Sequence, residues 1–239
     1  MGKFLYEMHC HTNEVSRCGK VSAAGLIENY YRMGFSGVCI TDHDIDASST
    51  ISKKLSWDER VTLFEKGYAE AKKKGDELGV DVFFAWEYSY HCGLQYAGGN
   101  DFLTYCLDID WMRNHPEMSL CSLPEYSNAV HADGGVIVHA HPFREEGYID
   151  MIRLNPRIID AVEVFNAGRT DKENKMAEIY AEVYELPKWA GSDNHVGKMP
   201  VYGAVAFDRK MSSLREICDE LLAGRGEIIK LQDKDNVGG

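Results

Sequence analysis

Histidine and carboxylate residues follow directly on five short apolar runs that have the composition of β-strands. The runs span residues 3–8, 37–40, 81–86, 135–138 and 188–192. Side chains at the carboxyl ends of neighbouring parallel strands converge on one rim of a barrel or a sheet. A rim that collects so many nitrogen and oxygen ligands is typical of a binding site for metal ions.

Segments between and after these runs have the periodicity and the caps of helices. Helices are predicted at residues 23–32, 57–78, 123–132, 171–184 and 213–222, and further strands at 101–107, 158–165, 201–207 and 227–231. Strands that alternate with helices imply parallel strands joined by crossover connections. Candidate ligands follow at least five strands, whereas an open sheet usually has its site at one switch point. We therefore expect a closed α/β barrel.

Length and charge narrow the classes of function. The 239 residues suit one domain, with residues 232–239 expected to fray as a tail. The net charge of -12 disfavours long nucleic acid, whose phosphates need a basic surface. It is compatible with a small anionic substrate, because bound cations reverse the local sign.

Cysteine usage and hydropathy indicate the compartment. The seven cysteines are scattered without a CxxC pair, so full disulfide pairing is impossible and a thiolate zinc site is disfavoured. The first strand follows the N-terminal residues without a signal-peptide pattern, and no apolar run approaches the roughly 20 residues of a membrane span. We expect a cytoplasmic protein with no membrane partner.

The clearest metal-binding pattern is a pair of spaced histidines. His9 and His11 stand two positions apart at the end of the first strand. Residues i and i+2 of a strand face the same side, so both rings can reach one ion. Asp193 and His195 repeat this spacing after the run at 188–192. All four are predicted metal ligands.

Three further ligands are predicted at other strand ends. His43 is one, and Asp42 before it is expected to orient a histidine ring. Glu87 ends an apolar run, where an unpaired buried carboxylate is costly, so we expect it to bridge metal ions. His139 and His141 compete for one place, and the proline that fixes the chain after His141 favours His141.

Basic residues that follow strand ends are candidates for substrate binding. Arg144, Arg169 and Lys198 are predicted to hold phosphate oxygens, the arginines through two-pronged contacts. A solvated surface charge is the alternative for each of them.

The ordered motifs resemble those of the PHP (polymerase and histidinol phosphatase) family. They are HxHT at residues 9–12, TDHD at 41–44, Glu87, AHPFR at 140–144 and GSDNH at 191–195, and they span essentially the whole chain. The resemblance implies a distorted (β/α)7 barrel of TIM-like form, with the metal site at the C-terminal rim of the strands. It also implies two or three divalent ions (Mn, Fe or Zn) and phosphoesterase activity.

The resemblance assigns the ligands to individual ions. For the first ion it implies four ligands: His9, His11, Glu87 and Asp193. Glu87 would bridge to a second ion that His141 also binds. His43 and His195 would serve a third ion, and they are the expected catalytic residues, protonating the leaving group directly or through water.

Two positions depart from the family pattern. Asp101 stands where the family often has a histidine before the leucine of the fourth strand, and we expect it to bind metal as a harder, carboxylate ligand. Residues 12–19 lack the aspartate that completes the third site in many members. Two alternatives stay open there: Glu14 as the replacement ligand, or Arg17 as a cation that takes the place of the third ion and contacts phosphate.

The main functional hypothesis is hydrolysis of a small phosphate monoester, such as histidinol phosphate or a nucleotide, through a metal-activated water. One alternative is an amidohydrolase-like enzyme that cleaves C–N or C–O bonds. Such barrels also begin with HxH, but they commonly carry a metal-bridging lysine at the end of the fourth strand, and residues 101–107 contain none. Another alternative is a non-catalytic binding module that keeps its metal site for stability or regulation.

Overall fold

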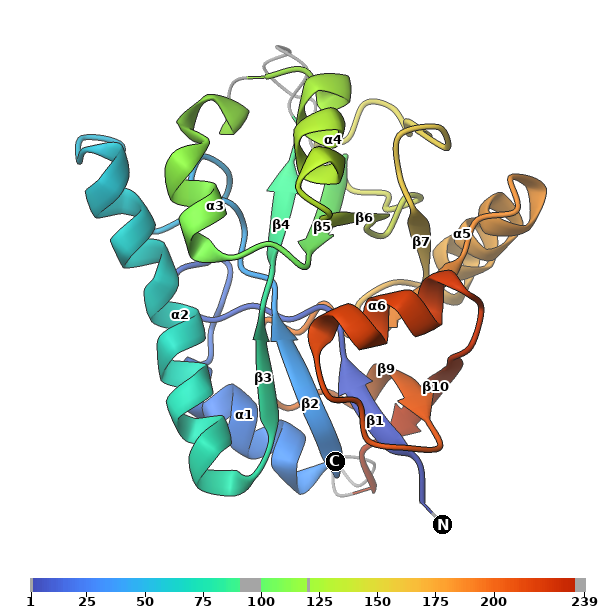
Figure 1. Cartoon of the computed structure of the whole chain (residues 1–239). Coiled ribbons are helices and arrows are strands. Elements are labelled where there is room, and N and C mark those ends of the chain that lie inside the picture. Colours follow the sequence, from blue (N-terminus) through green and yellow to red (C-terminus); the bar gives the residue numbers. More distant parts are fainter. Residues whose placement is uncertain (1, 91–99, 120, 235–239) are drawn as a thin grey trace.

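The computed structural model describes residues 2–90, 100–119 and 121–234 (Figure 1). In the first half of the chain the elements are β1 (Phe4–Glu7), α1 (Ala23–Arg32), β2 (Phe35–Ile40), α2 (Trp57–Leu78), β3 (Asp81–Phe84), β4 (Trp86–Ser89), β5 (Asp101–Tyr105) and α3 (Ile109–Asn114). A short 3-10 helix at Pro116–Ser119 follows. The second half contains α4 (Leu123–Ala132), β6 (Val136–His139), β7 (Ala161–Asn166), α5 (Asp171–Val183), β8 (Lys188–Gly191), β9 (Val201–Phe207), α6 (Leu214–Leu222) and β10 (Glu227–Gln232).

The strands form two five-stranded sheets, in the orders β10-β9-β1-β2-β3 and β4-β5-β6-β7-β8. The pairs β1–β2, β2–β3, β6–β7 and β7–β8 are parallel, as expected from the crossover helices. The pairs β1–β9, β9–β10, β4–β5 and β5–β6 are antiparallel, so the expectation of parallel strands throughout is wrong. Helical connections do not by themselves fix strand direction, and β9 returns along the edge of β1.

The closed (β/α)7 barrel is not confirmed, because the described strands leave the two sheets separate. The sheets meet at Ala85, the single residue between β3 and β4. Its amide donates to Ile40 O at 3.0 Å, and the chain then turns into the second sheet. One isolated parallel bridge, between His43 and Glu87, joins the two sheets just beyond this point.

The sheets also approach each other at β1, β8 and β9. An isolated parallel bridge links Cys10, beyond β1, to Asn194, beyond β8. A Cβ atom on Gly203 of β9 would lie only 2.1 Å from Gly191 O of β8, so the two backbones touch here because position 203 is glycine. The carboxyl ends of β1 and β8 therefore face the same space although the strands belong to different sheets.

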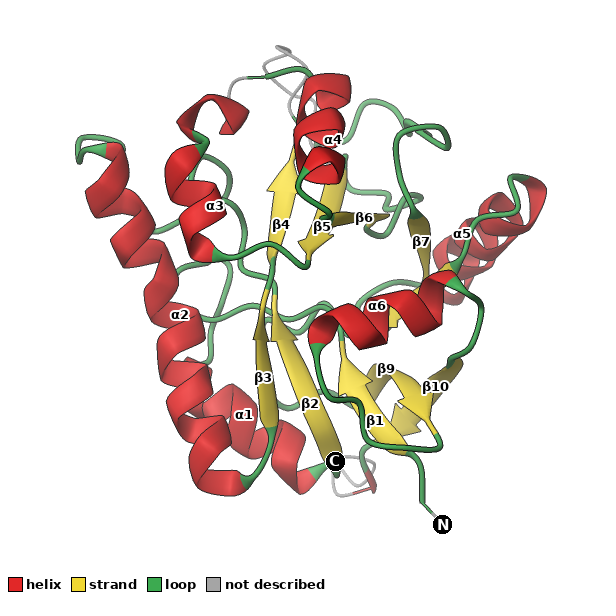
Figure 2. Cartoon of the chain, in the orientation of Figure 1, coloured by secondary structure: helices red, strands yellow, loops and turns green. Residues whose placement is uncertain are grey.

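Helix starts are fixed by side-chain caps. The N-terminal residues of α2, α4 and α5 are preceded by Ser56, Ser122 and Thr170, and each forms a capping box with a glutamate three positions on. Figure 2 shows α1 and α2 beside the first sheet and α4 and α5 beside the second. Trp86 is buried in a core that includes residues of α2, α4 and α5, whereas Trp189 is buried in another core that includes Ile217, Cys218 and Leu221 of α6.

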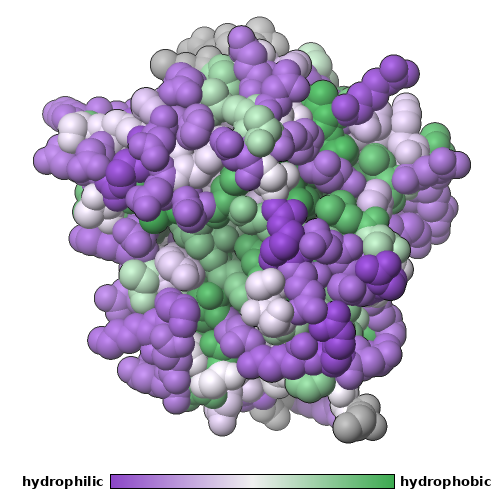
Figure 3. Space-filling view, in the orientation of Figure 1, coloured by the Kyte–Doolittle hydropathy of each residue, from purple (hydrophilic) through white to green (hydrophobic). Residues whose placement is uncertain are grey.

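The visible surface is mostly hydrophilic, with hydrophobic atoms showing mainly in the hollow between the helices (Figure 3). Among the helices of the described ranges, none is both long and apolar enough to cross a bilayer. Near the C-terminus, Gln232 still pairs with Val201, and the amide of the buried Asp233 donates to Pro200 O. Residues 235–239 of the expected tail lie outside the described residues.

Candidate metal centre

The candidate ligands lie where strand ends of both sheets meet. Six of them (His43, Glu87, Asp101, His141, Asp193 and His195) border a cavity of about 580 Å³, whereas His9 and His11 are fully buried and do not line it. The structure brings together most of the predicted metal ligands there, from β1, β2, β4, β6 and β8 and the turns that follow them: His9, His11, His43, Glu87, His141, Asp193 and His195.

The first group comprises His9, His11 and Asp193. The Nε2 atoms of the two histidines lie 3.1 Å apart, and they are 3.5 and 3.3 Å from Asp193 Oδ1. Tetrahedral ligands with bonds of about 2.0–2.1 Å stand about 3.3 Å apart, so these separations suit one small divalent ion. The histidine side chains are fully buried, and that of Asp193 keeps only 7% of its surface exposed.

Glu87 links this group to the other histidines. Its Oε1 lies 3.1 Å from His141 Nε2 and 3.6 Å from His9 Nε2. Its Oε2 lies 2.8 Å from His43 Nδ1 and 3.5 Å from His11 Nε2. Each carboxylate oxygen thus faces two imidazoles, which is the arrangement that a bridging carboxylate needs.

The electrostatics keep Glu87 ionised. Burial alone would raise its pKa, but the charges of His43 and His9 and the hydrogen bond with His141 hold it well below its usual range. Within the described residues, Glu87 Oε2 and His43 Nδ1 have no hydrogen-bond partner although they are in contact. Buried polar atoms without partners are costly, and atoms aimed at a common centre fit a cation. Imidazole and carboxylate donors suit Mn, Fe and Zn.

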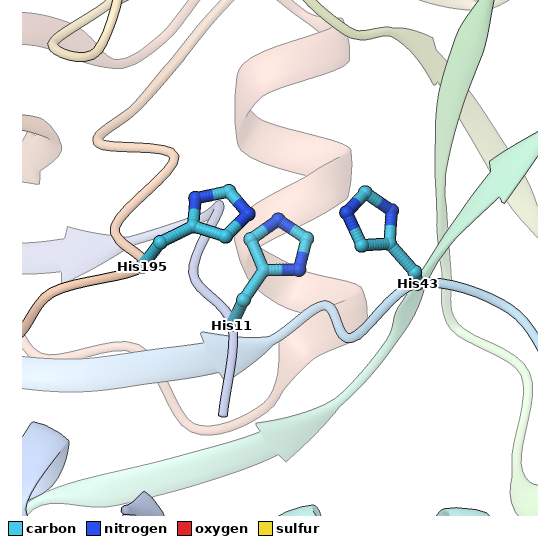
Figure 4. Close-up of side chains that lie close together, drawn as sticks. All are labelled: His11, His43 and His195. Atoms are coloured by element: carbon cyan, nitrogen blue, oxygen red, sulfur yellow. The ribbon is translucent and has the colours of Figure 1, made fainter. Parts of the chain in front are cut away.

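A third group consists of His11, His43 and His195. Figure 4 shows the ring of His11 between the other two. The ring centroids of His11 and His195 are 4.2 Å apart at 17°, and those of His11 and His43 are 4.5 Å apart at 29°. One nitrogen from each ring lies within 4.8 Å of the others. His11 therefore borders two groups at once.

Two buried carboxylates behind the ligands were missed by the sequence reasoning. Glu163 of β7 contacts His9 Nδ1 at 2.9 Å, and its other oxygen accepts from His141 N at 3.0 Å. Glu7 accepts from the amides of His9 and Ser192 at 2.9 and 2.8 Å, and burial raises its pKa to about 7 although those bonds lower it. Both residues could have been found from the sequence, because each is an acidic residue within or at the end of an apolar, strand-like run.

Asp42 acts on the ligands indirectly rather than by the expected contact with a ring. It accepts from Thr12 N and Thr12 Oγ1 and from Ser16 Oγ, each at 2.7 Å. Ser16 Oγ in turn lies 3.3 Å from His11 Nδ1. Burial raises the pKa of Asp42 to about 6 despite these bonds. Gly67 of α2 leaves room for this cluster, since a Cβ there would lie 2.5 Å from Asp42 Oδ2 and Thr12 Oγ1.

Two ligand positions have a left-handed backbone. His141 has φ 28° and Asp193 has φ 53°, a region that residues with side chains rarely adopt. His139, by contrast, is buried with no partner for either ring nitrogen among the described residues, and it stacks on Phe102 at 4.9 Å between centroids. Burial, followed by the charge of His141, lowers the pKa of His139 to about 3, so it is a neutral core residue.

The predicted substrate-binding residues differ in position. Arg144 and Arg169 both line the cavity. Arg144 Nη1 lies 3.8 Å from Oδ2 of the buried Asp101, which also lines it. Arg169 Nη1 pairs with Glu146 Oε1 at 3.3 Å. Lys198 is exposed and stands apart from the described residues that line this cavity.

The segment after His11 contains the two residues that were predicted to complete the third ion position, Glu14 and Arg17, and also Cys18. Glu14 accepts from Ala23 N at 3.0 Å and so serves the start of α1. Arg17 lines the cavity but donates to Ser49 O at 2.9 Å. Cys18, which sequence reasoning missed, lines the same cavity as His43 and His195 and lies in the stretch that lacks the family's aspartate. Burial would raise the pKa of its thiol, but hydrogen bonds with the His195 and His43 rings lower it to about 6.

Comparison with known proteins adds a partial family match. The family described as PHP-associated matches residues 171–225, which include α5 and α6. No curated protein matches the chain.

Solved structures share the fold at low identity. A two-domain protein from Bacteroides vulgatus containing a predicted PHP-like metal-dependent phosphoesterase has a TM-score of 0.70 and 14% identity, over 95% of this chain and 65% of that one. A protein from Bifidobacterium adolescentis described as a metal-dependent phosphoesterase has a TM-score of 0.58 and 16% identity, over 91% and 95% of the two chains.

A nuclease shares the fold as well. The lesion-specific endonuclease PfuEndoQ from Pyrococcus furiosus has a TM-score of 0.65 and 14% identity, over 96% of this chain and 58% of that one. This chain thus spans less than two thirds of the Bacteroides protein and of the endonuclease. The comparisons thus give a PHP-associated match over residues 171–225 and a fold shared with PHP-like phosphoesterases.

Proposed function

We propose that this chain is a metal-dependent phosphoesterase that hydrolyses a small phosphate monoester, such as histidinol phosphate or a mononucleotide. The observation that carries the proposal is the position of Glu87. This buried carboxylate faces four imidazoles with its two oxygens, at one side of a cavity that arginine side chains border. Such a shared carboxylate can hold two cations close together, as two-metal phosphoesterases require.

The ligands proposed for two or three ions of Mn, Fe or Zn are His9, His11, His43, Glu87, Asp101, His141, Asp193 and His195. When bound, such ions would lower the pKa of water and offset the negative charge of the phosphoryl group. Asp101 is included because its buried carboxylate lines the same cavity as Glu87 and His141. Its oxygens give this position a harder character than a histidine would.

The chain's own cations would bind the substrate. Arg144 and Arg169 have Nε atoms without hydrogen-bond partners among the described residues, and both line the cavity, so they are proposed to hold phosphoryl oxygens. Arg17 is proposed at the rim of the cavity. Lys198, being exposed, is proposed only for contacts with parts of the substrate that extend beyond the cavity.

Two roles are proposed for His43 and His195. They would bind a third ion, and they would protonate the leaving group directly or through water. The side chain of His195 is 24% exposed and that of His43 is 11% exposed. His195 is therefore the ring that a leaving-group oxygen approaches more easily.

A small substrate suits the charge of the chain better than DNA does. With a net charge of -12, the chain offers long nucleic acid mainly repulsion outside the cavity. The proposal includes a reducing compartment such as the cytoplasm, since the cysteines are scattered and unpaired in pattern. The fold shared with a lesion-specific endonuclease makes duplex DNA a necessary comparison substrate.

Phosphate release from a panel of phosphomonoesters tests the proposal. The panel contains histidinol phosphate and mononucleotides, and each is assayed with added Mn²⁺, with Zn²⁺ and with chelator. We expect turnover that chelator abolishes and metal restores, and we expect its loss in the double variant His9→Ala/His11→Ala. His131→Ala, which removes a histidine from the exposed part of α4, is the matched control and should keep full activity.

Other substrates separate the alternatives. Cleavage of lesion-containing duplex DNA at physiological salt, with no phosphate release from the panel, would replace the monoester proposal by a nuclease. Cleavage of amide or lactone substrates alone would favour the amidohydrolase-like alternative. Stoichiometric metal binding with no turnover on any substrate would favour the binding module.

A further inference from the structure

We propose that α5 is the contact helix of a homodimer, in which the α5 helices of two copies of this chain pack side by side in antiparallel directions. The inference goes beyond the proposed function and is independent of it. The residues that form the contact surface do not line the cavity of the candidate metal centre.

Helix α5 has hydrophobic residues on two faces. One face, which includes Ala177 and Tyr180, is buried in a core that also includes residues of β7. The other face carries Met176, Ile179 and Val183, which are 41%, 41% and 69% exposed. Spacings of three and four residues place these side chains in one row along the helix. A surface helix normally has a single apolar face, so this row is an unpartnered second one.

The other helices of the chain lack such a row. Helix α1 exposes one large hydrophobic residue, Tyr31, and within the described residues α2, α3, α4 and α6 expose none. Exposed hydrophobic residues that stand singly are ordinary, whereas a contiguous group marks an interaction surface. Figure 1 shows α5 at the outer right of the molecule, beyond the second sheet, where another protein can reach it.

The charges beside the row suit a second copy of the same helix. Lys175 and Glu182 each stand directly before a residue of the row, so they border the same side of it, about two helical turns apart. Consider two copies of α5 packed antiparallel around a twofold axis that passes between residues 178 and 179. Lys175 of each copy then faces Glu182 of the other. The surface is therefore complementary to itself, as a twofold homodimer requires.

The same charges disfavour a parallel arrangement, which would set Lys175 against Lys175 and Glu182 against Glu182. Within one copy, Lys175 Nζ contacts Glu178 Oε2 at 2.8 Å, and Lys188 Nζ contacts Glu182 Oε1 at 3.0 Å. Exposed pairs of this kind contribute little to stability, so they can be exchanged for contacts across the interface. Burial of the hydrophobic row supplies the attraction, and the charges fix the direction.

The expected dimer is weak. One helix face offers less surface than the roughly 1,600 Å² that standard interfaces bury. The net charge of -12 on each copy also opposes association. We therefore expect a monomer–dimer equilibrium that depends on protein concentration.

Sedimentation equilibrium of the full-length protein at several concentrations tests the dimer. Ile179→Glu places a charge beside the twofold axis and should raise the dissociation constant at least about 10-fold. Tyr31→Glu, at the exposed hydrophobic residue of α1, is the matched control and should dimerise like the wild type. Both positions are exposed, so both variants should fold, and thermal unfolding followed by circular dichroism checks this.

Charge reversal tests the antiparallel direction. Lys175→Glu and Glu182→Lys should each weaken the dimer, because like charges then face each other across the interface. The double variant Lys175→Glu/Glu182→Lys should recover the lost affinity, since its pairs are reversed but intact. An equimolar mixture of the two single variants should form heterodimers more tightly than either variant forms homodimers. Single variants that dimerise like the wild type would contradict the antiparallel contact.

Two outcomes overturn the inference as a whole. A wild type that sediments as a monomer at every concentration would leave the row on α5 to a different protein. A dimer that Ile179→Glu does not weaken would show that the copies meet elsewhere. Neither outcome bears on phosphate release, so a failure of this inference is distinct from a failure of the proposed function.

Discussion

The Nδ1 atom of His9 lies 2.9 Å from Oε1 of Glu163, and both side chains are fully buried. The other oxygen of Glu163 accepts a hydrogen bond from His141 N at 3.0 Å. One carboxylate on β7 therefore orients the ring of one candidate ligand and fixes the backbone of another. Such contacts behind a metal ligand set its tautomer and raise its basicity.

Replacing Glu163 by glutamine tests this relationship. Glu163→Gln keeps the shape of the side chain but removes the charge that supports the His9 ring. We expect metal affinity to fall by about 10–100-fold with the fold intact, as measured by competition with a chromophoric chelator. Glu182→Gln, an exposed position on α5, should bind metal like the wild type. Unchanged affinity in Glu163→Gln would show that His9 needs no such support.

Glu87→Gln should have a larger effect. An amide cannot supply two anionic oxygens to the surrounding imidazoles, so the groups that share Glu87 both lose charge. We expect metal affinity to fall by more than the ~10–100-fold typical of a supporting residue, together with phosphate release. Metal content by mass spectrometry and turnover are the measurements, and Glu70→Gln on the exposed side of α2 is the control. Full metal content would contradict the bridging role.

Gly67→Ala tests the packing of α2 against the centre. The added methyl would lie 2.5 Å from Asp42 Oδ2 and Thr12 Oγ1, both held by short hydrogen bonds. Although alanine is the better helix former, we expect a net loss of about 1–3 kcal/mol in the free energy of unfolding, measured in urea.

A second helical glycine gives the comparison. In Gly25→Ala on α1 the new Cβ would meet only the ends of two side chains at 3.3 Å. This variant should match or exceed the stability of the wild type. Equal changes in the free energy of unfolding for the two variants would mean that Asp42 and Thr12 can move away from the added methyl group at little cost.

Glu7 should give metal-free protein a defined pH dependence. Burial raises its pKa from 4.5 to about 7, so its contribution to stability is fully present below about pH 4.5 and is lost as pH rises through about 7. In chelator, the wild type should therefore lose more stability than Glu7→Gln between about pH 5 and 8. Urea unfolding at several pH values measures this, and parallel curves for the two proteins would contradict the prediction.

Helix caps and hydrophobic periodicity predicted the helices well, because these signals lie within the segment that forms each helix. The helices at Ala23–Arg32, Trp57–Leu78 and Leu123–Ala132 have the predicted bounds, since each begins after a serine cap. The run at 81–86 was predicted as one strand, but Ala85 divides it between two sheets. Strand direction and sheet membership depend on which distant edge a strand meets, and no pattern within the strand encodes that.

In the candidate site, too, the features set within one segment were predictable, whereas the contacts between distant segments were not. The spacing of His9 and His11 predicted their convergence, because the strand itself sets it. Glu163 was missed, since its role depends on contacts across the fold with His9 and His141. Its residue type was visible in the sequence, but the two residues that it contacts come from other elements.

The turn at Ala85 has a mechanical consequence. It places Glu87 on the seam between the sheets, so the carboxylate belongs to one sheet while His9, His11 and His43 extend from the other. Any sliding of one sheet over the other changes all of these distances at once. Metal ions bound by ligands from both sheets would therefore cross-link the sheets. The force needed to slide one sheet over the other would then increase with the number of bound ions.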